Sequence, residues 1–315
     1  MAPASAGAKP ATSGSTKIVV SFTEVSAAEL PRIVASETGL FQKHGVDVQE
    51  RMIPGVTGVD ALVSGDVQVT LAGGAQALSA IAGGADLQIV GTPFPTYGFL
   101  FYAPASIKTP ADLKGKKIGV PSAGSTGEVA VRLALPRFGL DPLKDVTMVY
   151  LGSPQARVPA LLGGSVDGSP ITVPDNVKLD SSGFHSLFDI SQLKLEAVTQ
   201  VVQTQRSWLA NHRDAMQGFI DGLVEANVRI KKDKPFALEM MRKHLKYDDE
   251  RMYEMSYDYY FAQGAIPTLM HPKPSQFADS MTVLGEKNEK VRNLDLGKIL
   301  DPSFVQAAAD RGLAG

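Results

Sequence analysis

Residues 61–67 read ALVSGDV, and residues 160–166 repeat this pattern as ALLGGSV, 99 positions further along the chain. A second match keeps nearly the same spacing, because residues 17–20 (KIVV) return as residues 117–120 (KIGV). Two matches in the same order and at nearly the same offset indicate that one structural unit occurs twice in this chain.

Each copy of the unit has the pattern of a strand, a small-residue turn, a helix, a second strand, a short helix and a third strand. We expect strands at 17–21, 46–52 and 67–71 in the first copy and at 117–121, 146–151 and 166–171 in the second. The main helices should cover 27–43 and 125–138, ended by Gly45 and Gly139, since glycine suits the left-handed conformation after a helix. Strands that alternate with helices predict two α/β lobes, each a mostly parallel sheet flanked by helices.

The remaining segments suggest how the chain is divided between the lobes. Residues 1–16 are almost wholly Ala, Pro, Ser, Gly and Thr, so we expect a flexible tether or a remnant of cloning. The apolar stretch 89–101 should leave lobe one, the strand-like stretch 197–203 should return to it, and the pattern after residue 211 is helical. We therefore expect two crossings that form a natural hinge, with lobe one at 17–102 plus 203–315 and lobe two at 103–202.

The overall composition excludes several classes of protein. The 315 residues include 31 Lys and Arg against 33 Asp and Glu, so the chain lacks the basic surplus typical of nucleic-acid-binding proteins. No stretch approaches the roughly 20 apolar residues of a membrane helix. With 0 Cys, disulfides, thiolate metal sites and Cys nucleophiles are excluded. A small-residue tether without a signal peptide suits an exported protein whose signal or lipid-bearing Cys has been removed.

A ligand of an open parallel sheet binds beyond the carboxyl ends of the strands. The repeat marks four turns there that are small, polar or Gly-rich, so that backbone amides can approach a ligand closely. The candidate ligand-binding residues in these turns are Ser21, Phe22, Thr23, Glu24, Gly73, Gly74, Ala75, Gly124, Ser125, Thr126, Ser169, Pro170 and Thr172.

The sharpest motif among these turns is GSTGE at 124–128. Ser125 and Glu128 match a capping box, which predicts a helix N-terminus whose positive end favours an anionic or strongly polar group. The alternative is a well-capped helix without a ligand. In the matching turn of the first copy, Glu24 could accept from an amine or amidine, or it could serve only the dipole of the following helix. Phe22 could stack on a planar ligand or cover the edge of the core.

Two arginines and a group of aromatic residues are weaker candidates. Arg32 and Arg157 could pair with a carboxylate or sulfonate, but both lie in helical segments and we expect them on solvated faces. Trp208 and the aromatic residues between Tyr257 and Phe261 are expected to pack in the core of lobe one.

The motifs of several catalytic classes are missing from the sequence. The 5 His are scattered without ligand spacing, and neither a phosphate-binding glycine loop nor a nucleophile elbow occurs. We therefore expect no catalytic residue, no metal and no cofactor.

Several segments resemble the bacterial ABC-transporter solute-binding proteins of the nitrate/sulfonate/taurine type, including the thiamine-pyrimidine-precursor group. The segments that carry the resemblance are 35–48 (ASETGLFQKHGVDV), 61–67 (ALVSGDV), 112–120 (DLKGKKIGV), 124–125 (GS) and 160–168 (ALLGGSVDG). They are specific for the family and consist mostly of scaffold, so they do not name a ligand.

The resemblance implies a type II periplasmic-binding-protein fold that closes on a small organic ligand at the four turns named above. It also implies the permease and ATPase subunits of an ABC importer as partners, and a location in the periplasm or at the outer face of the cytoplasmic membrane. We expect a monomer that contacts the membrane only through a possible lipid anchor. The ligand would be an organic sulfonate or carboxylate, or a pyrimidine-like heteroaromatic.

Enzymes on the same fold are the alternative. A menaquinone-pathway enzyme remains open, whereas the related pyrimidine synthase depends on a Cys-rich motif that this sequence lacks. The ligand-sensing domain of a regulator is a further alternative, although no DNA-binding segment is visible.

Overall fold

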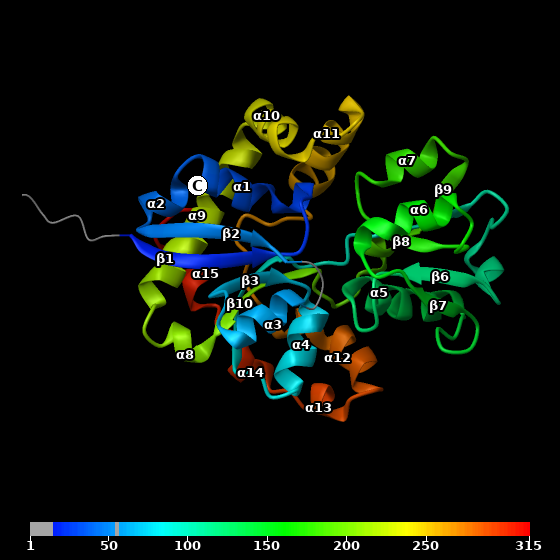
Figure 1. The fold of residues 1–315 in the computed structure, drawn as a ribbon, viewed down its shortest axis with the longest axis horizontal. Helices are drawn as coiled ribbons and strands as arrows, with labels where there is room; N and C mark the ends of the chain where they lie inside the picture. Colours follow the sequence, from blue (N-terminus) through cyan, green and yellow to red (C-terminus); the bar gives the residue numbers. More distant parts are fainter. Residues whose placement is uncertain (1–14, 54–56) are drawn as a thin grey trace, which may run out of the picture.

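The computed structural model describes residues 15–53 and 57–315, which form two lobes joined by two crossings (Figure 1). Most of the predicted tether, residues 1–14, lies outside the described residues. Lobe one holds a five-stranded sheet in the order β2-β1-β3-β10-β4, and lobe two holds sheets in the orders β8-β5-β9 and β6-β7. The strands are β1 Thr16–Phe22, β2 Val46–Met52, β3 Val69–Ala72, β4 Leu87–Phe94, β5 Leu100–Pro104, β6 Lys117–Val120, β7 Thr147–Tyr150, β8 Ser169–Ile171, β9 Phe184–Asp189 and β10 Gln200–Gln205.

The strands of the first copy and the first two strands of the second pair in parallel, as predicted. The third strand of the second copy, β8, instead pairs antiparallel with β5. β1 is parallel to β2 and β3, and β6 is parallel to β7. Every antiparallel pair among the described residues includes β5 or β10, the two strands that begin directly after a crossing. Both sheet regions are therefore mixed, because a strand that arrives from the other lobe enters its sheet in the opposite direction.

The chain before β10 contributes short helices, and the chain after β10 is mostly helical. The helices before β10 are α1 Leu30–Glu37, α2 Leu40–Lys43, α3 Thr57–Ser64, α4 Gly74–Ala82, α5 Thr126–Ala134, α6 Arg157–Leu162 and α7 Asn176–Asp180. The later helices are α8 Arg206–Leu209, α9 Arg213–Lys232, α10 Lys234–Leu245, α11 Glu250–Tyr257, α12 Ala278–Gly285, α13 Glu289–Arg292, α14 Leu296–Ile299 and α15 Ser303–Asp310. The predicted helix at 27–43 is divided, because Gly39 takes a left-handed φ of 71° and ends α1 before α2 begins.

Alternating side chains of β1 build two layers around the sheet of lobe one. Ile18 and Val20 point into a core with α1 and α9, and Val19 packs on the other side against the cluster that contains α3. Helix α9 lies very close to α2: the rings of Phe41 and Phe219 stack with centroids 5.0 Å apart. A Cβ added at Gly218 would collide with the carbonyl oxygen of His44, so only glycine permits this approach.

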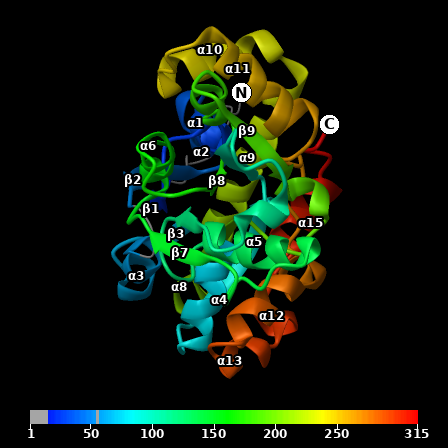
Figure 2. The same ribbon diagram turned by 90° about the vertical axis from the view of Figure 1, so that its right-hand side faces the viewer.

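Helix α5 belongs to lobe two but packs against lobe one. Val129 and Ala130 of α5 are fully buried in one cluster with Leu78 of α4 and Phe277, the residue before α12. Figure 2, which views lobe two end-on, shows α4 and α12 below it and α10 and α11 above it. Arg132 of α5 also donates to Glu286 at 2.6 Å. The two lobes therefore share a buried seam in addition to the two crossings.

The strand pairing favours crossings slightly earlier than the sequence predicts. β4 ends at Phe94 in lobe one and β5 already pairs within lobe two from Leu100, whereas β10 is back in lobe one from Gln200. We propose crossings at about 95–99 and 194–199 in place of the predicted boundaries at 102/103 and 202/203. The apolar stretch 89–101 thus contains two strands, separated by a turn.

Within residues 15–53 and 57–315, none of the helices has the length and apolar character that a membrane crossing requires.

Candidate ligand-binding site

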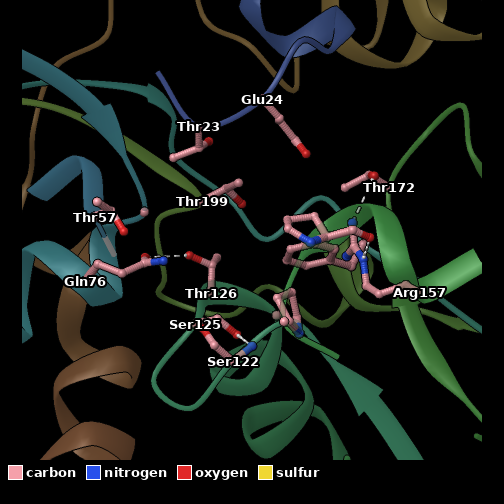
Figure 3. Close-up of a pocket in the computed structure, with 16 residues that line it drawn as sticks. Thr23, Glu24, Thr57, Gln76, Ser122, Ser125, Thr126, Arg157, Thr172 and Thr199 are labelled. Carbon is pink, nitrogen blue, oxygen red and sulfur yellow. Dashed lines mark hydrogen bonds between the residues drawn. The ribbon is translucent and has the colours of Figure 1, made fainter. Parts of the chain in front are cut away.

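A cavity of about 270 Å³ lies between the lobes, at the carboxyl ends of β1, β3, β6 and β8 (Figure 3). Lobe one contributes Thr23, Glu24, Thr57, Gly73 and Gln76 to its lining. Lobe two contributes Pro121, Ser122, Ser125, Thr126, Gly127, Gly152, Pro154, Arg157 and Thr172, and the crossings contribute Phe99 and Thr199. The volume lies near the lower limit for small-molecule sites, so the cavity suits a compact ligand.

The structure brings about half of the candidate ligand-binding residues into this lining. They are Thr23, Glu24, Gly73, Ser125, Thr126 and Thr172. Gly124 lies beside the cavity and lines a neighbouring hollow instead. Contact of these residues with a ligand stays a prediction.

The other candidates are buried beside the cavity, because they lie inside regular structure rather than beyond its end. Ser21 and Phe22 belong to β1, where the Ser21 hydroxyl bonds to that of Thr70. Ser169 and Pro170 belong to β8, where the Ser169 hydroxyl donates to the Gly119 carbonyl at 2.8 Å. The sequence prediction therefore began the turns after β1 and β8 too early.

The remaining two candidates, Gly74 and Ala75, form the first turn of α4 and are not among the lining residues of the cavity. A Cβ at Gly74 would lie 3.0 Å from the Val198 carbonyl, and Ala75 is fully buried in the seam. Contact of their backbone amides with a ligand stays a prediction.

The N-terminus of α5 presents hydrogen-bond donors to the cavity. Ser125 accepts from the Glu128 amide at 3.3 Å, which confirms it as the N-cap of α5. The Glu128 carboxylate accepts from the Gly124 amide and not from the Ser125 amide that a capping box uses. The amides of Thr126 and Gly127 are the first two of the helix, so they have no acceptor within it. Both residues line the cavity, and the helix therefore offers an acceptor or anion its positive end.

Arg157 is the buried cation of the site, and the expectation of a solvated face was wrong. Its side chain is 3% exposed and is fixed by donation to the carbonyls of Pro154 at 2.9 Å and Pro170 at 2.7 Å and to the Thr172 hydroxyl at 3.4 Å. These bonds use three of its five N–H groups. No carboxylate of the described residues lies within 4.0 Å of its nitrogens.

The position of Arg157 explains the error. It is the first residue of α6, a helix of 6 residues in which Arg157 and Leu161 are buried. Leu161 packs in the core of lobe two, whereas Arg157 lines the cavity. Burial lowers the pKa of Arg157 and the nearby charge of Glu24 opposes that shift, so the guanidinium stays charged.

Glu24 faces the same cavity from lobe one. Burial raises the pKa of Glu24, while the charge of Arg157 acts in the opposite direction and those of Asp175 and Glu29 add to the rise. The Gln155 amide of lobe two donates to Glu24 at 3.5 Å, which makes a contact between the lobes. The cavity therefore has a cationic side at Arg157 and an acidic side at Glu24.

The other residues considered from the sequence are structural. Arg32 is also buried rather than solvated: it donates to Glu29 at 2.9 Å and to Glu50, and its guanidinium covers the Phe22 ring at 3.7 Å. Trp208 stacks on His212, and Tyr260 donates to the Val173 carbonyl at 2.8 Å. These groups hold lobe one and its contacts together, as expected for the aromatic residues.

Sequence reasoning missed several lining residues that come from outside the four turns. Phe99 and Thr199 lie on the two crossings, Thr57 begins α3, and Gln76 lies in the first turn of α4. Gln76 could have been predicted from the sequence, because it is a polar residue three positions after Gly73, the N-cap glycine of α4. The rest reach the cavity only through the packing of the lobes.

The described part of the chain holds no group of three or more His, Asp or Glu side chains arranged to bind a metal ion.

Comparisons with known proteins agree with this geometry. The family described as "NMT1/THI5 like" matches residues 27–230. A Brucella abortus (strain 2308) protein named a "putative binding protein" is 34% identical over 142 residues, which cover 45% of this chain and 43% of that relative's length. The match thus spans less than half of the curated relative.

Solved structures share the fold at low sequence identity. The periplasmic aliphatic sulphonate binding protein SsuA of Escherichia coli superposes with a TM-score of 0.72 at 20% identity, covering 88% of this chain and 94% of that one. The alkanesulfonate-binding protein SsuA of Xanthomonas axonopodis pv. citri, solved bound to MOPS, gives a TM-score of 0.72 at 20% identity over 94% and 99%. These likenesses confirm the periplasmic-binding-protein fold expected from the sequence, and, since the family match covers more than half of the residues, this chain belongs to the NMT1/THI5-like family.

Proposed function

We propose that this protein is an extracytoplasmic solute-binding protein that captures a small organic anion between its lobes and delivers it to an ABC importer. The family, the two-lobed fold and the cavity between the lobes support this proposal. Two structural neighbours are named for sulfonates, one of them solved bound to MOPS. The permease and ATPase subunits would be its partners, and the periplasm or the outer face of the cytoplasmic membrane its location.

Arg157 is the observation that carries the proposal. A buried cation without a carboxylate partner is costly, and an anionic ligand removes that cost. The two N–H groups of Arg157 that remain free and the first amides of α5 give a sulfonate or carboxylate several charge-assisted hydrogen bonds. The anionic end of the ligand therefore belongs on the lobe-two side of the cavity.

The opposite side of the cavity suits a hydrogen-bond donor. Glu24 is available there as an acceptor, so the preferred ligand carries an amine or another donor away from its acidic group. A pyrimidine-like heteroaromatic with an amino group would use the same two sides, with Phe99 beside its ring. Both ligand classes are compact, in keeping with the size of the cavity.

Capture would proceed without chemistry. Among the described residues, the polar side chains of the lining are Ser, Thr, Gln, Glu and Arg, and no His or Lys lies there beside a hydroxyl group. Affinity would come from the donors and from burial as the lobes close, and release would follow their reopening.

A thermal-shift screen over sulfonates, carboxylates, pyrimidines and amino compounds tests the proposal, with calorimetry on the hits. A ligand at a hundredfold excess over its Kd stabilises the folded protein by about 2.7 kcal/mol. A hit should then be recovered chemically unchanged after unfolding and mass spectrometry. Failure of every class to stabilise the protein would contradict the proposal, and a converted hit would identify an enzyme instead.

A further inference from the structure

A second hollow of about 270 Å³ adjoins the cavity, and Gln76 lines both of them. The walls of this outer hollow are Val59, Asp60, Ser79 and Ala80 of α3 and α4 and Ala123 and Gly124 of lobe two. Asp60, Ser79 and Ala123 are exposed, so the outer hollow opens to solvent. Gln76 therefore lies between the ligand cavity and an open space of equal volume.

The wall between the two spaces is built from both lobes. Thr126 of α5 donates from its hydroxyl to the Gln76 side-chain oxygen at 3.3 Å, and the two side chains meet in Figure 3. A Cβ at Gly73 would collide with both the Gln76 amide and the Thr126 hydroxyl, so the absence of a side chain there makes room for the contact. Gly73, Gln76 and Thr126 thus form one partition across the cleft.

We propose that Gln76 determines specificity by limiting the length of the ligand, an inference that rests on the proposed function. The Gln76 side chain fills the space through which a longer ligand would pass from the cavity into the outer hollow. Its other described neighbours in the wall are glycine and a short hydroxyl side chain, so no other group replaces it when it is shortened. Compact anions are accepted by the protein as it stands, and chains that extend past the partition are excluded.

Calorimetry with unbranched alkanesulfonates, from methane- to octanesulfonate, tests the length limit. In the wild type, Kd should fall about fourfold for each added methylene until the chain meets Gln76, and then rise. In Gln76→Ala the fall should continue through at least about two further methylenes, because the opened passage buries them.

Two control variants separate bulk from other effects. Gln76→Met fills a similar volume without the hydrogen bond to Thr126 and should keep the wild-type limit. Ser79→Ala changes only the outer hollow and should keep it as well. A wild-type length profile in Gln76→Ala would overturn the proposal.

A crystal structure of Gln76→Ala decides the same point without any ligand. The expected structure has one continuous space from the cavity into the outer hollow, and a structure with the cavity still closed would overturn the proposal. If no member of the screened classes binds the wild type, the proposed function fails, while this crystal structure still decides whether Gln76 forms the wall.

Discussion

Arg157 and Glu24 are opposite charges that face one cavity without touching each other. Arg157 is fixed by two backbone carbonyls and the Thr172 hydroxyl of its own lobe, so it cannot swing across to Glu24 without losing three hydrogen bonds. Among the described side chains, Gln155 is the one hydrogen-bond partner of Glu24, at 3.5 Å. The proposed ligand would lie in the space between these two charges.

Removing the charge of Arg157 should weaken binding of an anionic hit strongly. Arg157→Gln loses charge-assisted hydrogen bonds of about 1.5–3 kcal/mol, or about 10- to 150-fold in Kd. Calorimetry measures the change, and Lys144→Gln is the control because that side chain is 82% exposed in lobe two. Equal Kd values for the two variants would place the anion elsewhere.

The raised pKa of Glu24 predicts how its replacement affects stability. Above pH 4.5, the ordinary pKa, the Glu24 carboxyl is ionised in the unfolded chain but resists ionisation in the folded protein. Its contribution to the free energy of unfolding is therefore lost as the pH rises through its pKa in the folded state. Glu24→Gln should therefore raise the free energy of unfolding in urea at pH 7, and the gain should vanish below about pH 4.

Glu37→Gln is the matched control for this pH dependence. A hydrogen bond from Lys243 lowers the pKa of Glu37, so this carboxylate stabilises the fold above its ordinary pKa and loses that effect in acid. Its replacement should lower the free energy of unfolding at pH 7. The prediction for Glu24 is contradicted if both variants shift stability in the same direction.

At the scale of elements, the close approach of α9 to α2 depends on glycine. Gly218→Ala places a methyl group against the His44 carbonyl, and this backbone group cannot rotate away as a side chain could. The substitution should destabilise the protein by about 1–3 kcal/mol despite the better helix propensity of alanine. Urea unfolding measures the effect. Gly297→Ala in α14 is the control, because its nearest neighbour is the Asp295 side chain at 3.2 Å; equal losses in both variants would show that the α9 contact is not special.

The sequence predicted the elements that carry a local pattern. Strands β1, β2, β6 and β7 and the cap of α5 follow from apolar runs and from Ser125 with Glu128. The break at Gly39 was missed because the apolar spacing continues across it, and only a left-handed φ reveals it.

The site was predicted less completely, since a cavity is made by surfaces that are distant in sequence. Thr57 and Phe99 reach it only because the lobes dock. Whether Arg157 is buried or exposed depends on how the short helix α6 packs against β8, and local sequence does not determine this packing. Candidates that lie beyond the ends of strands line the cavity more often than candidates that lie inside strands.

At the scale of the whole molecule, both crossings contribute to the lining through Phe99 and Thr199. A ligand in the cavity would therefore contact the segments that must bend when the lobes move. Small-angle X-ray scattering should show a smaller radius of gyration when a hit saturates the protein. Arg157→Gln at the same ligand concentration should keep the value of the free protein, and an unchanged radius in the saturated wild type would contradict closure.

Helix α5 joins the two lobes through a shared buried cluster, so we expect them to fold as one unit. Its buried residues Val129 and Ala130 pack into the core of lobe one. Lobe two produced alone would therefore expose these apolar side chains to water and aggregate. The intact chain should for the same reason melt in a single calorimetric endotherm, although its sheets are separate.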